Sequence, residues 1–185
     1  MGTYFMKRKI FISINIPEKF RKRLVKATTV WQPLPIKWTK EKNLHITIAF
    51  LGHVSDDLIA GICEKVHDTV RNSEIFDLEF DSITLGPTKE QPRMIWLNGK
   101  ISEELRILQE QIEKSLDIFV ASKKTFRPHI TLGRIRKNKW EALKESPKIE
   151  VKFPLIVSVE SVEVMASDFT GDGPEYTIIE SCQLS

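Results

Sequence analysis

The chain has 185 residues, of which 41% are hydrophobic and 29% charged, and its formal net charge is +3. This apolar content is enough to bury a core, and together with the mixed charges it excludes a disordered or collagen-like chain. The mild basic excess is compatible with a partner that carries phosphate, and many ordinary soluble proteins share it.

The first half of the chain predicts three strands separated by two helices. Alternating apolar residues predict strands at 9–17, 43–52 and 75–87, and apolar residues at helical spacing predict helices over 18–32 and 55–73. The second helix has Ser55 at its expected N-cap and Leu58 on its expected buried face. The proline-broken segment 33–38 is predicted to be a loop.

The second half of the chain repeats the order strand, helix, strand. Its predicted elements are strands at 93–100 and 126–136 around a helix over 102–119, then a short helix over 139–146 and further strands within 151–167 and 175–184. No low-complexity linker separates the halves, so we expect one bilobal domain over residues 1–185. Strands and helices that do not alternate continuously indicate the α+β class.

The cysteines and the N-terminal segment exclude several other classes. Cys63 and Cys182 lie far apart and match no ligand spacing, so neither a disulfide framework nor a zinc site is predicted. The apolar run from Ile10 to Ile16 is too short to span a membrane and has no signal-peptide cleavage pattern. We therefore expect a cytoplasmic protein.

Two nearly identical tetrapeptides, residues 45–48 and 129–132, lie on predicted strands at matching places in the two halves. Side chains alternate between the faces of a strand, so His45 and Thr47 share one face, and His129 and Thr131 share one face in the same way. If the two strands meet about a pseudo-twofold axis, they form a groove with two imidazoles and two hydroxyls.

This set of side chains suits phosphoryl transfer at a phosphodiester. Two imidazoles whose pKa values lie near neutrality can divide the general acid and general base roles, and hydroxyls can donate hydrogen bonds to the phosphate oxygens. A metal site has less support, because the chain has no His-x-x-x-His pair, and a serine hydrolase would need a Gly-x-Ser-x-Gly elbow that is absent. Chance likeness of two strands is the remaining alternative, and the repeated order of elements argues against it.

The two tetrapeptides and their flanks resemble a known family. The segments "LHITIAFLGHV", "RMIWL", "RPHITLGRIR" and "GDGPEYTIIESCQL" are similar to the 2H phosphoesterase superfamily, and within it to the RNA 2′,3′-cyclic phosphodiesterase or 2′-5′ RNA ligase family. The resemblance implies a bilobal α+β fold with pseudo-twofold symmetry, in which two antiparallel sheets line a central groove and the helices lie outside.

The resemblance also implies an activity and the roles of four residues. The reaction would be hydrolysis of an RNA terminal 2′,3′-cyclic phosphate to a 2′-phosphate, without a metal or another cofactor. His45 would be the proton donor and His129 the proton acceptor, while Thr47 and Thr131 would hold the phosphate oxygens. The expected partners are RNA ends or cyclic nucleotides, with no membrane, and the expected state is a monomer.

Two other functions stay open at this point. Reversible 2′-5′ ligation of tRNA halves would use the same histidines, with a ribose hydroxyl in place of water. A module that binds RNA ends without catalysis is the alternative from another class, although both motifs are intact.

Three further residues are candidates for substrate binding. Phe50 and Arg134 each stand five residues after a motif histidine, and aromatic rings and guanidinium groups are the side chains that stack on bases. Strand parity places both on the face opposite the histidines unless the strands bend, and Gly52 and Gly133 make a bend there plausible. We predict that Phe50 and Arg134 contact the terminal base and that Arg127 holds the phosphate or orients the strand.

Overall fold

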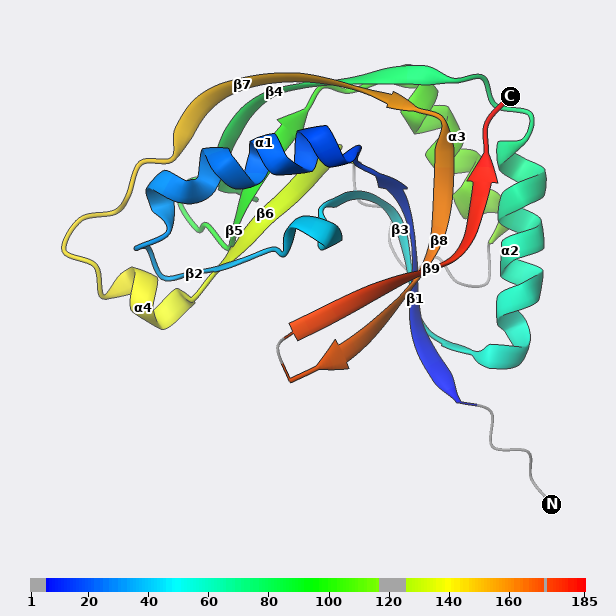
Figure 1. Cartoon of the computed structure of the whole chain (residues 1–185), viewed down its shortest axis with the longest axis horizontal. Helices are drawn as coiled ribbons and strands as arrows, with labels where there is room; N and C mark the ends of the chain where they lie inside the picture. The colour runs from blue at the N-terminus through cyan, green and yellow to red at the C-terminus, as the bar shows by residue number, and fades with distance from the viewer. Residues whose placement is uncertain (1–5, 117–125, 172) are drawn as a thin grey trace.

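The computed structural model describes residues 6–116, 126–171 and 173–185. Within them one nine-stranded sheet runs in the order β7-β4-β5-β6-β3-β1-β8-β9, with β2 added beside β6 (Figure 1). The strands are β1 (Lys7–Asn15), β2 (Ile36–Trp38), β3 (His45–Ser55), β4 (Phe76–Gly86), β5 (Met94–Gly99), β6 (His129–Ile135), β7 (Glu150–Val159), β8 (Ser161–Thr170) and β9 (Gly173–Gln183). The helices are α1 (Glu18–Thr28), α2 (Asp56–Val70), α3 (Glu103–Ser115) and α4 (Lys137–Glu141), with short 3-10 turns η1 (Thr29–Trp31) and η2 (Glu41–Asn43).

The sheet consists of two lobes that meet where β3 lies beside β6. Among the described residues, their paired register contains one residue pair, Ile46 with Ile130. Outward from this junction the order is β6-β5-β4-β7 in one lobe and β3-β1-β8-β9 in the other, and every pairing is antiparallel. The expected α+β fold is confirmed, and the two expected sheets are joined into one by that residue pair.

The helices lie outside the sheet. Helix α1 contacts β6 and η2, whereas α2 packs against α3 and covers β3, β8 and β9 (Figure 1). The buried side of β1 shows why the strand forms, since Ile10, Ile12 and Ile14 alternate along it and are almost fully buried. This side of β1 is therefore anchored in the core.

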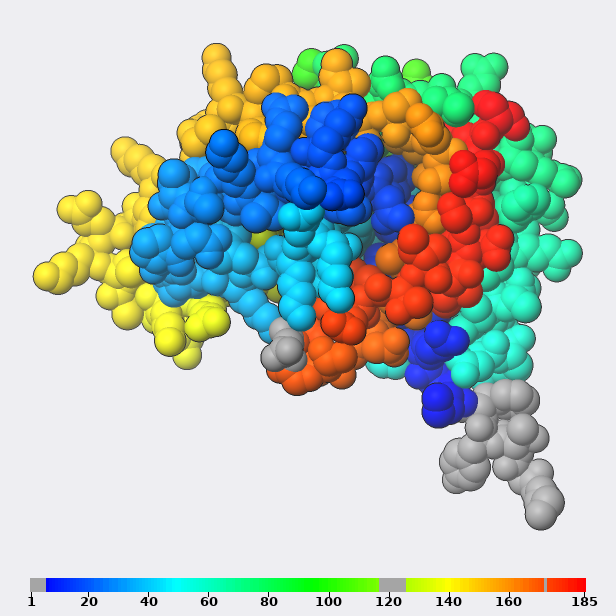
Figure 2. All heavy atoms as spheres, viewed as in Figure 1, coloured from blue at the N-terminus to red at the C-terminus, as the bar shows by residue number. Residues whose placement is uncertain are grey.

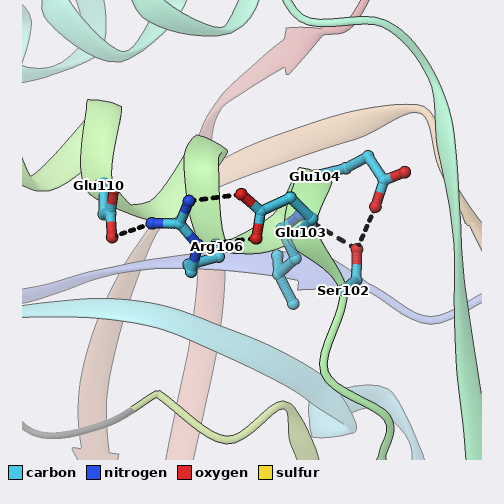
Figure 3. Close-up of polar contacts among 6 residues, drawn as sticks. Ser102, Glu103, Glu104, Arg106 and Glu110 are labelled. Atoms are coloured by element: carbon cyan, nitrogen blue, oxygen red, sulfur yellow. Dashed lines mark hydrogen bonds and ion pairs between the residues drawn. The ribbon is translucent and has the colours of Figure 1, made fainter.

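Among the described α-helices, α3 is the one whose N-cap side chain makes a capping hydrogen bond. The Ser102 hydroxyl accepts a hydrogen bond from the Leu105 N–H at 3.2 Å and donates one to the Glu104 carboxylate at 2.8 Å (Figure 3). Arg106 pairs with Glu103 and Glu110 on the exposed side (Figure 3). The serine satisfies a backbone donor at the helix end, while exposed ion pairs of this kind contribute little to stability.

Four local predictions differ from the structure. Segment 36–38, predicted to be a loop, is strand β2, because it pairs with β6 despite the prolines before it. Within the described chain the Ser55 hydroxyl makes no cap bond to α2, and Ile59 is buried in place of Leu58. Helix α4 begins before the predicted 139–146 and is shorter, and residues 117–119 of the predicted third helix lie outside the described residues.

Candidate active site

The two tetrapeptides meet at the junction of the lobes. Ile46 and Ile130 are the second residues of their motifs, they pair with one another, and both are fully buried. Because neighbouring residues on a strand point to opposite faces, each histidine and its threonine lie on the other face of the sheet, and all four are partly exposed. We call this the histidine face. The antiparallel pairing about Ile46 and Ile130 is the pseudo-twofold relation that the repeated motifs predicted.

His45 is held at both ring nitrogens. Its Nδ1 lies 2.7 Å from the carbonyl oxygen of Asn43, and its Nε2 lies 2.9 Å from the Thr47 hydroxyl. A carbonyl oxygen only accepts, so Nδ1 carries a proton, and in the neutral ring Nε2 accepts from Thr47. The Asn43 side chain donates to the carbonyl oxygen of Pro174 at 2.8 Å, which ties the segment before β3 to the β8–β9 hairpin.

Aromatic side chains from two other strands surround His45. The ring centroid of Phe11, on β1, lies 5.1 Å from that of His45, and the centroid of Tyr176, on β9, lies 5.2 Å away in an edge-to-face arrangement at 86°. Phe11 and Tyr176 contact each other at 5.0 Å. These rings pack around the imidazole and contribute to its burial.

His129 is oriented by an equivalent hydrogen bond to a backbone carbonyl and by a different aromatic neighbour. Its Nδ1 lies 2.7 Å from the carbonyl oxygen of Arg127, which again stands two residues before the histidine. Its ring stacks on Trp96 of β5, with centroids 4.0 Å apart and planes 27° apart. Because Nδ1 donates to the carbonyl oxygen, the neutral ring keeps the Nε2 lone pair available to accept a proton.

Burial lowers the pKa of both histidines below the ordinary value of 6.5. For His45 the hydrogen bond to Asn43 opposes this effect and the charge of His129 adds to it, which indicates that the two rings lie within electrostatic reach of each other. For His129 the hydrogen bond to the Arg127 carbonyl opposes it, and the Arg127 guanidinium adds to it. At neutral pH both imidazoles of the free protein are therefore mostly neutral.

A β-bulge after each threonine changes the face of the residues that follow. The register of β3 against β1 skips Ile48, and the register of β6 against β5 skips Leu132, the fourth residue of each motif. Phe50 pairs with Phe11, which lies two residues from Ser13, the partner of Thr47. Arg134 pairs with Met94, which lies two residues from Trp96, the partner of Thr131. Phe50 and Arg134 therefore lie on the histidine face.

The exposure of these candidate binding residues agrees with that placement. The burial pattern of the first six residues is the same in β3 and β6, with the sixth residue, Phe50 or Arg134, exposed in each. The Phe50 side chain is 64% exposed, although its centroid lies 6.2 Å from that of Phe11. Arg127 is also exposed, and its contact with His129 is made by its carbonyl oxygen. The role of each in binding stays a prediction.

Four residues of the site were not predicted from the sequence, namely Phe11, Asn43, Trp96 and Tyr176. One signal was available in β1, where alternation that buries Ile10, Ile12 and Ile14 leaves Phe11 on the opposite face. Trp96 and Tyr176 occur in segments that carry the resemblance, but their contacts with the histidines depend on how β5 and β9 are placed.

The described residues include neither a metal-ion cluster nor a membrane-spanning helix. No group of three or more His, Cys, Asp and Glu side chains is arranged there to hold a metal ion. None of the described helices combines the length and apolar character that crossing a membrane requires.

Comparison with known proteins places the chain in a family. A Thermotoga maritima protein named RNA 2′,3′-cyclic phosphodiesterase is 30% identical to this chain, and the match covers 95% of each chain. A Bacillus subtilis protein of the same name is 28% identical, and that match covers 95% of this chain and 96% of the other. A crystal structure from Thermus thermophilus has a TM-score of 0.82 at 24% identity, with 95% of this chain and 97% of that chain covered. Apo LigT from Escherichia coli has a TM-score of 0.79 at 22% identity, with 97% and 99% covered, so both structures share the fold. The model of the 2′-5′ RNA ligase superfamily matches residues 17–169, and the chain belongs to this superfamily, as the paired motifs predicted.

Proposed function

We propose that the protein hydrolyses the 2′,3′-cyclic phosphate at RNA ends to a 2′-phosphate, with His45 as general acid and His129 as general base and without a metal ion. The observation that carries the proposal is the pairing of Ile46 with Ile130, which brings one histidine and one threonine from each lobe onto one face. Relatives that cover nearly the whole chain are named RNA 2′,3′-cyclic phosphodiesterase. LigT, which shares the fold, has been crystallised with 3′-AMP.

The reaction needs one proton removed and one supplied. His129 Nε2 takes a proton from water, the water oxygen bonds to phosphorus, and the bond from phosphorus to O3′ breaks. His45 Nε2, protonated at the start, gives its proton to O3′, so the products are a 3′-hydroxyl and a 2′-phosphate. Solvent then exchanges protons with both imidazoles and restores the starting state.

The ring beside His129 favours its role as the base. A base becomes positively charged when it accepts a proton, and the Trp96 ring stacked on His129 stabilises such a charge by roughly 0.5–2 kcal/mol. His45 has Thr47 at the nitrogen that would face the leaving oxygen. Thr47 and Thr131 would donate hydrogen bonds to the non-bridging oxygens as charge builds on them.

Phe50 and Arg134 supply candidate surfaces for the terminal base. They stand at equivalent places after the two bulges, on the histidine face, and are both exposed. An aromatic ring and a planar guanidinium stack on any base, so this pair favours affinity over base selectivity. Arg127 places a positive charge next to His129 and would attract the phosphate.

The test compares the wild-type protein with His45→Ala and His129→Ala in excess EDTA. The substrates are a cyclic mononucleotide and an RNA that ends in a 2′,3′-cyclic phosphate, and the product is analysed for the position of its phosphate. We expect a 2′-phosphate from the wild type and a loss of about 10²–10⁴-fold in kcat for each variant. Loss of wild-type activity in EDTA would overturn the metal-free mechanism, and turnover of neither substrate would favour a binding module.

Ligation is the second candidate, because the family model that matches the chain is named the 2′-5′ RNA ligase superfamily. A ribose hydroxyl would replace water as the nucleophile, and His129 would accept its proton. Adding an RNA with a free 5′-hydroxyl to the cyclic-phosphate RNA distinguishes the two reactions. A longer product with a 2′-5′ bond would mean that ligation competes with hydrolysis.

A further inference from the structure

Lys37 lies on the histidine face beside the predicted base-binding residue Arg134. The two residues are direct partners in the pairing of β2 with β6, so their side chains leave the sheet on the same face. Arg134 shares that face with Thr131 because of the bulge at Leu132. Like charges directly opposite each other destabilise a strand pair, and an anion bound next to them offsets that cost.

Gly173, the first residue of β9, meets Lys37. A Cβ atom on Gly173 would lie 3.3 Å from the Lys37 ammonium nitrogen, so this ammonium group rests against the hairpin backbone. The hairpin is held there by Asn43, which donates to Pro174, and by the ion pair of Lys42 with Glu175. Figures 1 and 2 show the hairpin lying next to the segment from β2 to η2.

The same hairpin carries the most exposed aromatic side chain among the described large hydrophobic residues. Phe169 is 82% exposed and stands two residues after Ser167, the partner of Tyr176. Alternate residues on a strand share a face, so Phe169 leaves β8 on the side of Tyr176, which contacts His45. Phe169 pairs with Pro174, the residue after Gly173, so its strand position adjoins the one that Lys37 meets. A positive charge and an aromatic ring are the two groups that bind single-stranded nucleic acid.

We propose that Lys37 and Phe169 form a second nucleotide subsite. Lys37 binds the phosphodiester on the 5′ side of the terminal nucleotide, and Phe169 stacks on the base beyond it. Thr131 and Arg134 pair on β5 with Trp96 and Met94, which are two residues apart, or roughly 7 Å along the strand. Lys37 pairs with Arg134 from β2, on the other side of β6, and so stands at the level of Arg134. The inference rests on the proposed function and specifies its substrate as an RNA chain of two or more nucleotides.

The experiment compares two substrates that differ by one nucleotide. kcat/KM is measured for a cyclic mononucleotide and for a dinucleotide that ends in a 2′,3′-cyclic phosphate, and the quantity of interest is the ratio of dinucleotide to mononucleotide. We expect Lys37→Ala and Phe169→Ala each to lower this ratio by about 10-fold. The matched controls, Lys65→Ala on α2 and Ile101→Ala, change an exposed residue elsewhere and should keep the wild-type ratio.

The salt dependence of kcat/KM is a second readout, specific for the phosphate contact. For the dinucleotide, Lys37→Ala should reduce the slope of log kcat/KM against log salt by about 0.7, whereas Phe169→Ala should leave the slope unchanged. Wild-type ratios in both variants would overturn the subsite. If the wild-type protein turns over the mononucleotide and gains nothing with the dinucleotide, the subsite is overturned and the proposed function stands. If the wild-type protein turns over neither substrate, the proposed function itself is overturned.

Discussion

Trp96 and His129 stack with their ring centroids 4.0 Å apart and their planes 27° apart. Trp96 is also the partner of Thr131 in the pairing of β5 with β6, so one indole adjoins both polar residues of the second motif. The position of the imidazole therefore depends on where β4 and β5 hold the indole. Gly86 sets that position, since a Cβ atom on it would lie 2.5 Å from two indole ring carbons.

Gly86→Ala should therefore impair catalysis without touching a histidine. The methyl group cannot fit beside the rigid indole, so Trp96 shifts and carries the stacked His129 with it. We expect kcat to fall by about 10- to 100-fold, with a smaller change in KM, because misplacement of a reacting group by about 1 Å has that effect. The control is Gly61→Ala on α2, where an added Cβ meets nothing within 4 Å. Wild-type kcat in Gly86→Ala would contradict the dependence of His129 on Trp96.

Asn43 connects His45 to the β8–β9 hairpin, and its loss should destabilise the protein. The residue is 5% exposed, and its side-chain nitrogen lies 2.8 Å from the Pro174 carbonyl oxygen. Asn43→Ala leaves that oxygen without its partner, so the free energy of unfolding in urea should fall by about 1–3 kcal/mol. The exposed Asn72→Ala serves as the control and should change it by less than about 0.5 kcal/mol. Equal effects of the two substitutions would mean that the buried hydrogen bond contributes nothing.

Phe50→Ala should separate base binding from phosphate chemistry. The substitution removes the proposed stacking surface, so KM for a cyclic nucleotide should rise by about 10-fold, with less effect on an abasic cyclic phosphate. Val30→Ala, which truncates a 74%-exposed side chain in η1, is the matched control. If Phe50→Ala changes KM equally for both substrates, the ring does not contact the base.

The local pattern of each strand was enough to predict which side chains of each motif share a face. Alternation alone placed His45 with Thr47 and His129 with Thr131, and the repeated order of elements predicted that the two pairs meet. The bulges at Ile48 and Leu132 could not be predicted, because a bulge is defined by the partner strand and the local alternation does not reveal it. For that reason simple parity placed Phe50 and Arg134 on the wrong face, and only the allowance for a bend kept them as candidates.

The surroundings of the two histidines required the tertiary structure. Trp96 and Tyr176 reach the site from strands whose neighbours are set by the order of the whole sheet, and β2 forms only because β6 supplies its partner. Lys37 gained its place in the same way. Propensity favoured a loop there, and pairing with Arg134 overrode it.

The pH dependence of the reaction tests the roles of the two histidines together. The base must be neutral, so activity rises as the pH rises through the pKa of His129. The acid must be protonated, so activity falls as the pH rises through the pKa of His45. Burial lowers both pKa values below 6.5, and kcat/KM reports the free protein. We therefore expect a bell-shaped profile of kcat/KM with its maximum on the acid side of pH 6.5, its two limbs belonging to the coupled pair of histidines.

The profile of kcat should differ from that of kcat/KM in a defined direction. A bound phosphodiester places a negative charge next to the histidines, which favours their protonated forms and raises their pKa values. The falling limb of kcat should therefore lie at higher pH than the falling limb of kcat/KM. Both profiles are measured at constant ionic strength with a cyclic mononucleotide, and the imidazole NMR signals of the free protein report the same pKa values independently. A falling limb of kcat/KM well above neutral pH would contradict the assignment of the acid to a buried histidine.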